Sequence, residues 1–228
     1  SGGGNSVVPG EITMAHNGVL FLDELPEFRR DVLEVLRQPL EEGKINVVRN
    51  RYQEEYPAEF LFVAAMNPCR CGYYPSPKCT CSAPSIQHYL SRISQPLLDR
   101  FDLCVQTKRV DFAELMGESD DEPSVQIRER VIMALEIQKE RYADESFTFN
   151  SQVTSRVIEE YCRLSAETKE YMKQLFAAEE LTARGYYKIL KVARTIADLA
   201  GEKDVTRSHI AEAGYFRSLD RRFWEVRG

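Results

Sequence analysis

The stretch Gly18-Val-Leu-Phe-Leu-Asp-Glu-Leu25 places four apolar residues directly before two adjacent carboxylates. Such a continuous apolar run is typical of a strand that is covered on both faces of a parallel sheet. In an open parallel sheet, ligands bind beyond the carboxyl ends of the strands, where Asp23 and Glu24 would lie. A nucleotide hydrolase needs one carboxylate near its magnesium ion, here Asp23, and another to orient the attacking water, here Glu24. On this motif alone, a strand that simply enters a polar turn is an equally good interpretation.

Two later segments extend this pattern. Residues 60–65 form a second apolar run that ends in Met66-Asn67-Pro68, so the Asn67 carboxamide could hold the same water or the γ-phosphate. Residues 103–105 are expected to form a third strand, and Arg100 stands just before it. An arginine at that place can supply positive charge to a phosphoryl transition state. The spacing therefore favours a nucleotide site over a plain polar turn.

The segments between these strands indicate the fold class. Residues 31–40 carry a helical stripe of Val32, Val35, Leu36 and Leu40, and residues 44–56 alternate as in a polar hairpin. Strands separated by helical patterns imply an α/β fold with a parallel sheet. We expect an α/β domain over residues 1–110, a connecting helix within 111–146, mainly over 124–142, and an all-helical domain over 147–228. Four helices are expected there, around residues 153–161, 171–176 and 189–199 and from Thr206 onward.

Composition limits the remaining possibilities. Of the 228 residues, 43% are hydrophobic and 29% charged, as in an ordinary globular protein. No apolar stretch approaches the roughly 20 residues of a membrane-spanning helix, and the first residues do not resemble a signal peptide. We therefore expect a cytoplasmic protein without a membrane partner. The net charge of −6 argues against a surface that coats nucleic acid broadly, although a local basic element could still bind phosphates.

The ordered motifs resemble one family over nearly the whole chain. Residues 9–25, residues 65–69 and the helical pattern of residues 188–199 are similar to the magnesium-chelatase-like AAA+ ATPases, particularly the competence protein M type. The resemblance implies a partial P-loop NTPase core followed by an all-helical lid or C-terminal domain. It identifies Asp23-Glu24 with the Walker B motif, with Asp23 on Mg²⁺, and Asn67 with sensor 1. It also identifies Arg100 with an arginine finger and Arg184 with sensor 2, so Asp23, Asn67 and Arg184 would contact ATP.

The family's phosphate-binding loop is missing from this sequence. That loop, G-x-x-x-x-G-K-[ST], cradles phosphates with its amides and lysine, and Gly2-Gly-Gly4 is followed by neither Lys-Ser nor Lys-Thr. In the family the loop precedes the segment that corresponds to residue 1. We therefore expect this chain to be a fragment that binds ATP weakly or not at all by itself.

Four cysteines form a candidate metal site. Cys69, Cys71, Cys79 and Cys81 fall within thirteen positions, and the turn-forming residues between the two pairs could bring them together. Four thiolates can close a tetrahedral zinc site, which would pin an insertion after Asn67. A redox-labile loop or two unremarkable thiol pairs are the alternatives. We favour Zn²⁺ because clustered thiols in a cytosolic protein more often bind metal than form disulfides.

Lys44, Arg49 and Arg51 give the expected hairpin a basic character. In related ring motors this hairpin points into the pore, where a few cations from each subunit could follow a DNA backbone. The alternative is a solvated hairpin, which the nearby Glu41, Glu42, Glu54 and Glu55 favour.

These observations predict a two-domain AAA+ module whose complete form hydrolyses ATP with Mg²⁺ as a ring, expected to be a hexamer. Arg100 would act on the nucleotide of the adjacent subunit. The resemblance implies a DNA helicase or branch-migration motor of recombination during natural transformation. A magnesium-chelatase motor subunit and a regulatory scaffold ATPase are the alternatives.

Overall fold

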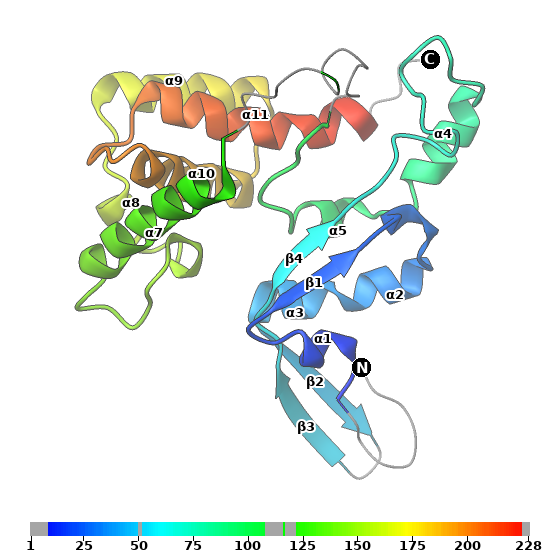
Figure 1. Ribbon diagram of the computed structural model, residues 1–228, viewed down its shortest axis with the longest axis horizontal. Helices are drawn as coiled ribbons and strands as arrows, with labels where there is room; N and C mark the ends of the chain where they lie inside the picture. Colours follow the sequence, from blue (N-terminus) through cyan, green and yellow to red (C-terminus); the bar gives the residue numbers. More distant parts are fainter. Residues whose placement is uncertain (1–8, 50–51, 108–115, 117–121, 225–228) are drawn as a thin grey trace. The chain divides into compact units, whose positions relative to one another are not determined.

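The computed structural model describes residues 9–49, 52–107, 116 and 122–224 (Figure 1). The described chain forms two compact units, one comprising residues up to Phe101 and the other the residues from Asp102 to Asp220. The expected fold class is confirmed, because a parallel strand pair with helices is followed by a helical region. The domain limits expected from the sequence stay predictions.

The first unit carries all the strands that the structure describes. Its elements are α1 (Glu11–Met14), β1 (Val19–Leu22), η1 (Leu25–Glu27), α2 (Arg30–Val35), α3 (Arg37–Glu42), β2 (Lys44–Arg49), β3 (Tyr52–Pro57), β4 (Leu61–Ala64), α4 (Ala83–Leu90) and α5 (Gln95–Leu98). β1 and β4 pair in parallel, from Val19 opposite Leu61 to Leu22 opposite Ala64, and β2 and β3 form the expected antiparallel hairpin. Residues 103–105, expected as a third strand, form none, and the Cys104 amide instead donates to the carbonyl of Phe216 at 3.1 Å.

The β1–β4 sheet is covered on one face, not on both as expected. Leu20, Leu22, Phe62 and Ala64 pack on the buried cluster that includes Leu33, Leu36 and Leu97. The alternate residues of both strands, opposite one another in the ladder, are exposed: Val19, Phe21, Leu61 and Val63. The apolar runs therefore form strands as predicted, but one face lacks a covering layer among the described residues.

The expected helix over residues 31–40 is divided into α2 and α3. Pro39 lacks the amide that would bond to residue 35 in a continuous helix, and its ring would clash with that carbonyl, so the break falls at Leu36. Leu33 and Leu36 are buried, whereas Val32 and Val35 of the predicted stripe are exposed. The predicted stripe therefore identified the wrong side of α2 as the buried one.

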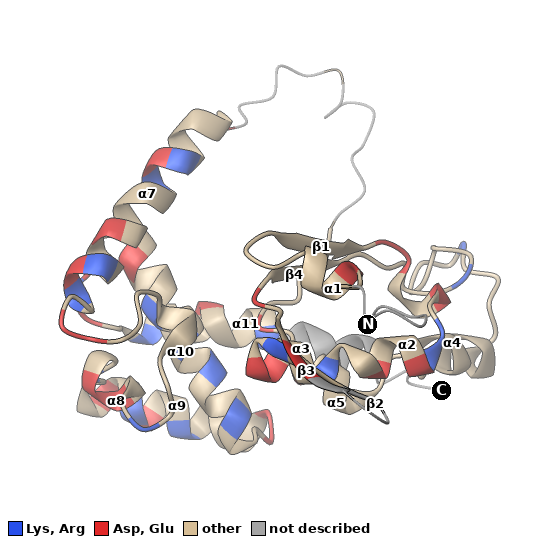
Figure 2. Cartoon of the chain, turned by 90° about the horizontal axis from the view of Figure 1, so that it is seen from below, with Lys and Arg blue, Asp and Glu red and all other residues tan. Residues whose placement is uncertain are grey.

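The second unit is helical, as expected. Its elements are α7 (Ser124–Arg141), η2 (Asn150–Gln152), α8 (Ile158–Tyr161), α9 (Ala166–Ala178), α10 (Ala183–Leu199) and α11 (Arg207–Trp224). The helix expected around residues 153–161 is only the short α8. α10 begins where the Thr182 hydroxyl accepts from the Gly185 amide at 3.1 Å, and it ends before Gly201, whose φ of 69° suits a helix C-terminus. Figure 2 shows residues of both charge signs along α7.

A buried ionic network fixes α7 against α10. The Asp198 carboxylate is wholly buried and accepts from both terminal nitrogens of Arg141 on α7, from Arg194 Nε at 3.1 Å and from Asn150 Nδ2 at 2.8 Å. Arg194 is itself only 2% exposed and donates onward to two carbonyls of the segment after α10. One carboxylate therefore pairs with two guanidinium groups inside the helical unit.

Removal of Asp198 should therefore destabilise the helical unit strongly. Asp198→Ala leaves Arg141 and the buried Arg194 without their carboxylate, so we expect a loss of about 3–5 kcal/mol in the free energy of unfolding. Urea denaturation followed by circular dichroism measures it. Glu170→Ala is the matched control, because Glu170 and Lys173 form an exposed pair at 3.7 Å, and it should leave the midpoint unchanged. Equal midpoints for both variants would contradict the assigned role of Asp198.

Candidate functional site

The parallel strand pair brings three of the predicted site residues to one edge of the sheet. The Leu22 carbonyl accepts from the Ala65 amide at 2.9 Å, and the Ala65 carbonyl accepts from the Leu25 amide at 3.0 Å. Asp23 and Glu24 directly follow β1, and Asn67 follows β4 by three residues. All three are exposed. This edge, with its two carboxylates and one carboxamide, has the donor set for a magnesium ion and a water molecule.

The turn after β1 holds Glu24 in an unusual backbone conformation. Glu24 has φ 51° and ψ 47°, in the left-handed region that residues other than glycine seldom adopt. Its amide donates to Asp23 Oδ1 at 2.8 Å, and its carbonyl accepts from the Glu27 amide at 2.7 Å. Such conformations concentrate at functional sites. The turn therefore engages the Asp23 carboxylate with the backbone while the Glu24 side chain is exposed.

Arg100 lies two residues beyond the end of α5 and is already engaged. The Ser94 hydroxyl caps α5 by accepting from the Leu97 amide at 3.3 Å. The side chain of Arg100 is 12% exposed, forms an ion pair with Glu41 at the end of α3, and donates to the Pro96 carbonyl at 2.6 Å. An arginine finger would have to exchange Glu41 for a phosphate. No sequence pattern indicates this partner, which is fifty-nine positions away.

The remaining predicted nucleotide residue belongs to the other unit. Arg184 is the second residue of α10 and is exposed. One turn later, Lys188 is only 16% exposed in its side chain and pairs with Asp102 at 2.9 Å. Burial lowers the pKa of Lys188, and the Asp102 carboxylate opposes that shift.

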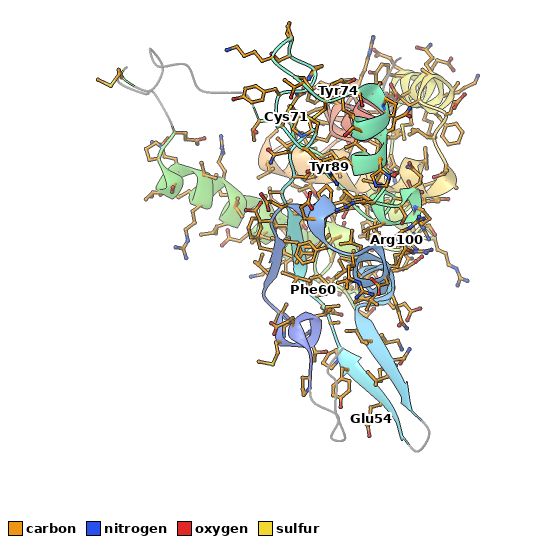
Figure 3. The ribbon with its side chains drawn as sticks, turned by 90° about the vertical axis from the view of Figure 1, so that its right-hand side faces the viewer. Glu54, Phe60, Cys71, Tyr74, Tyr89 and Arg100 are labelled. Carbon is orange, nitrogen blue, oxygen red and sulfur yellow. The ribbon has the colours of Figure 1, made fainter. Side chains whose placement is uncertain are left out.

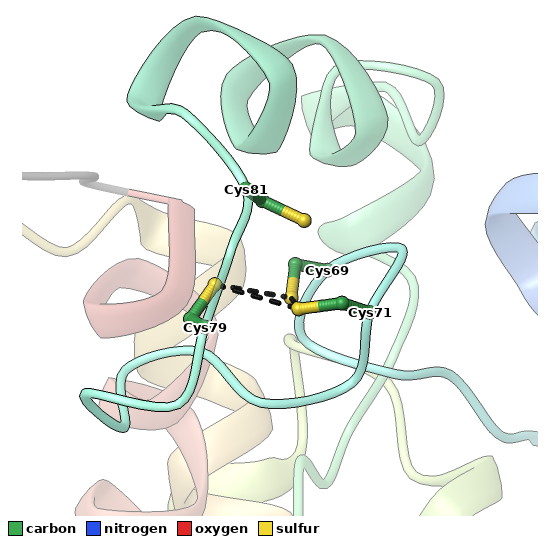
Figure 4. Close-up of side chains that lie close together, drawn as sticks. All are labelled: Cys69, Cys71, Cys79 and Cys81. Carbon is green, nitrogen blue, oxygen red and sulfur yellow. Dashed lines mark hydrogen bonds between the residues drawn. The ribbon is translucent and has the colours of Figure 1, made fainter.

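The four cysteines come together in the loop after Asn67 (Figure 4). Their Sγ atoms all lie within 4.8 Å of one another. Cys69 and Cys71 are 3.4 Å apart, Cys71 and Cys79 3.6 Å, and Cys69 and Cys79 3.7 Å. A zinc ion bonded to four thiolates at ~2.3 Å sets its sulfurs about 3.8 Å apart, so the observed spacing fits a tetrahedral zinc centre. Among the described residues, this is the one group of cysteine, histidine and carboxylate side chains arranged to hold a metal ion.

The surroundings of the sulfurs shift the pKa values of Cys71 and Cys79 in opposite directions. Backbone hydrogen bonds from Thr80 and Tyr73 lower the pKa of Cys71 to about 6. A backbone hydrogen bond at Cys81 lowers the pKa of Cys79, but burial and the neighbouring thiols outweigh it and raise that pKa to about 12. A bound cation would favour the thiolate form of all four cysteines.

The hairpin residues proposed for DNA are only partly described. Lys44 Nζ donates to the Glu55 carboxylate on β3 at 2.7 Å, and this hydrogen bond raises the pKa of Lys44. The side chain of Arg49 and the whole of Arg51 lie outside the described residues. In Figure 3, Glu54 lies on the hairpin at the opposite end of the unit from Cys71 and Tyr89. The pairing of Lys44 reduces the net positive charge that it offers to a ligand.

Two further residues, near the cysteine loop and η1, contribute to the site, although no sequence pattern indicated them. Tyr89 on α4 is 3% exposed and packs with Cys69 in a small buried cluster. Arg92, just after α4, donates from one Nη1 to the Pro26 carbonyl at 2.9 Å and to Glu27 Oε2 at 3.2 Å. Both contacts join segments more than sixty positions apart. They connect the cysteine loop to the turn that carries Glu24.

Comparison with known proteins identifies the family. Residues 1–115 match the family described as magnesium chelatase, subunit ChlI, and residues 121–217 match magnesium chelatase, subunit ChlI C-terminal. This chain belongs to the magnesium chelatase ChlI family of AAA+-type ATPases, as its motifs predicted.

Similar proteins include a competence protein and a magnesium-chelatase subunit. The chain is 43% identical over 221 residues to competence protein ComM of Haemophilus influenzae and 40% identical over 225 residues to YifB of Escherichia coli. In both cases 96% of this chain covers 43% of the relative, so the chain spans less than half of their length. A magnesium-chelatase 38 kDa subunit of Chlorobaculum parvum is 25% identical over 209 residues, with 89% of the chain covering 52% of the relative. No helix among the described residues is long and apolar enough to cross a membrane.

Proposed function

We propose that this chain is part of an ATP-hydrolysing AAA+ ring motor that acts on DNA as a helicase or branch-migration ATPase in transformation and recombination. The observation that carries the proposal is the parallel pairing of β1 and β4, which gathers Asp23, Glu24 and Asn67 at one edge. Asp23 would hold the Mg²⁺ of MgATP, Glu24 would orient the attacking water, and Asn67 would hold that water or the γ-phosphate. The working location would be the cytoplasm.

Ring formation is part of this mechanism. Arg100 would act on the ATP of the adjacent subunit in a homo-oligomer, expected to be a hexamer, and Arg184 would contact the nucleotide from the helical domain. The ion pair with Glu41 holds Arg100 in a defined place near the surface until a phosphate competes for it. The exposed apolar face of the β1–β4 sheet supports a larger core, since Val19, Phe21, Leu61 and Val63 would be covered by more sheet and helix.

The comparisons support the competence-type candidate more strongly than the magnesium-chelatase candidate. The identity to the competence protein is 43%, whereas that to the magnesium-chelatase subunit is 25%. A chelatase motor is the second candidate because that subunit also matches most of this chain. A regulatory scaffold ATPase is disfavoured by the Asp23-Glu24 pair and Arg100, which binding alone does not require.

ATP turnover by the full-length protein, with and without single-stranded or forked DNA, tests this function. We expect DNA to stimulate turnover and Glu24→Gln to lower kcat by about 10² or more, because the variant loses the carboxylate that orients water. Glu170→Gln, an exposed substitution in the helical unit, should turn over like the wild type. Turnover that is indifferent to DNA would instead support the chelatase or regulatory alternative.

We further propose that Cys69, Cys71, Cys79 and Cys81 hold a structural Zn²⁺. The Sγ–Sγ distances of 3.4–3.7 Å among Cys69, Cys71 and Cys79 support it, as do the position of Cys81 Sγ within 4.8 Å of these sulfurs and the complete burial of Cys69. Four protein ligands leave no open position, so the ion would stabilise the loop rather than take part in hydrolysis.

Elemental analysis of the chain, purified without chelators, tests the zinc site. We expect about one zinc per chain, lost in Cys79→Ser and in Cys81→Ser because three thiolates bind zinc far more weakly than four. Cys104→Ser, in the other unit, should keep the zinc. Wild-type protein without metal would refute this site.

Binding of single-stranded DNA by the full-length protein tests the hairpin. Arg49→Glu together with Arg51→Glu should weaken binding at least tenfold and flatten its salt dependence, because roughly 0.7 units of slope accompany each lost phosphate contact. Glu55→Gln is the opposite control, since it releases Lys44 from its ion pair and should strengthen binding slightly. Unchanged affinity in the double variant would contradict the DNA role and would show that the hairpin is an ordinary solvated turn.

A further inference from the structure

The cysteine loop, residues 69–81, joins the segment that carries Asn67 to α4. It begins two residues after Asn67, and α4 begins two residues after its last cysteine. No helix or strand is formed within the loop. A loop of this kind is held by its cross-links rather than by a hydrogen-bonded ladder, so an ion bound to all four thiolates would fix both of its ends.

At its first end the loop lies against Asn67. The Gly72 amide donates to the Cys69 carbonyl at 2.9 Å in a tight turn, and Gly72 has φ 75°, which other residues seldom adopt. A Cβ atom placed on Gly72 would lie 3.7 Å from Asn67 Oδ1. The turn that presents Cys69 and Cys71 therefore also borders the Asn67 carboxamide.

At its second end the loop reaches the Glu24 turn through α4. Tyr89 and Leu90 of α4 pack in the same buried cluster as Cys69, so α4 lies directly against the loop. Arg92 holds η1 directly through the Pro26 carbonyl and the Glu27 carboxylate, at 2.9 and 3.2 Å. In Figure 3, Cys71, Tyr74 and Tyr89 lie together at one end of the unit.

We propose that the four-cysteine metal site is a brace for hydrolysis, that α4 packs on it through Tyr89, and that Arg92 is the positioning residue that connects α4 to the Glu24 turn. Metal binding fixes the Gly72 turn against Asn67 and, through α4, fixes η1 behind Glu24. Both groups that orient the attacking water are then held by one centre. This inference rests on the proposed zinc site and on the proposed role of Glu24.

Hydrogen exchange tests the brace on the whole 228-residue chain without any nucleotide. The reporters are the amides of Leu25 and Glu27, which donate to Ala65 and Glu24. Cys79→Ser should speed exchange in the peptide over residues 18–28 roughly tenfold. Arg92→Ala should do the same while keeping its zinc, and the double variant should exchange no faster than either single variant. Peptides of α3, in the same unit as the reporters, should be unchanged in all three, which excludes general unfolding of that unit.

The possible outcomes distinguish failure of the brace from failure of the proposed zinc site. Wild-type chain without metal would overturn the brace and the zinc site together. Loss of zinc, or of Arg92, with unchanged exchange over residues 18–28 would overturn the brace alone, as would additive effects in the double variant. In the full-length protein, Arg92→Ala should lower kcat with little change in KM for ATP, and Arg92→Lys, which keeps a donor for Pro26, should recover most of it. A fall in stability without this kcat effect would make Arg92 merely structural.

Discussion

The arrangement of the candidate site depends on the register of the β1–β4 ladder. Leu22 opposite Ala64 places the residues after both strands at one edge, and two further backbone hydrogen bonds carry the pairing to Leu25 and Ala65. A slip of one residue would turn Leu20 and Leu22 toward solvent and move Asn67 relative to Asp23. Burial of alternate apolar side chains therefore selects the register, and the register in turn brings the polar groups together.

The strand pair alone does not determine the conformation of Glu24. A left-handed backbone at a glutamate costs on the order of 1–3 kcal/mol, so neighbouring contacts must maintain it. The Asp23 carboxylate and the Glu27 amide act from within the turn, and Arg92 acts on η1 from outside. The region after Asn67 therefore has a structural role, because its residue Arg92 supports η1 next to the Glu24 turn.

Local patterns in the sequence were sufficient for some elements and not for others. The apolar runs predicted β1 and β4, and the four clustered cysteines predicted a group whose sulfurs do come together. The division of the helix at Pro39 could have been predicted from the missing amide. The exposed sheet face could not, because an apolar run predicts that a strand will be covered but not which part of the chain covers it. Tyr89, Arg92 and the partner of Arg100 depend on contacts across roughly sixty positions, for which a single sequence gives no signal.

The ion pair of Arg100 is compatible with the proposed role of this residue in a ring. Glu41 is 44% exposed, so water can solvate its carboxylate when the ion pair opens and no buried charge is left on that side. A phosphate group offers more negative charge and accepts two parallel hydrogen bonds from a guanidinium group, which makes it the stronger partner. Because the Pro96 carbonyl holds Nη1 independently of Glu41, the arginine would stay ordered while it changes partners. Exchange of an internal partner for a nucleotide on a neighbouring subunit would then couple ring assembly to hydrolysis.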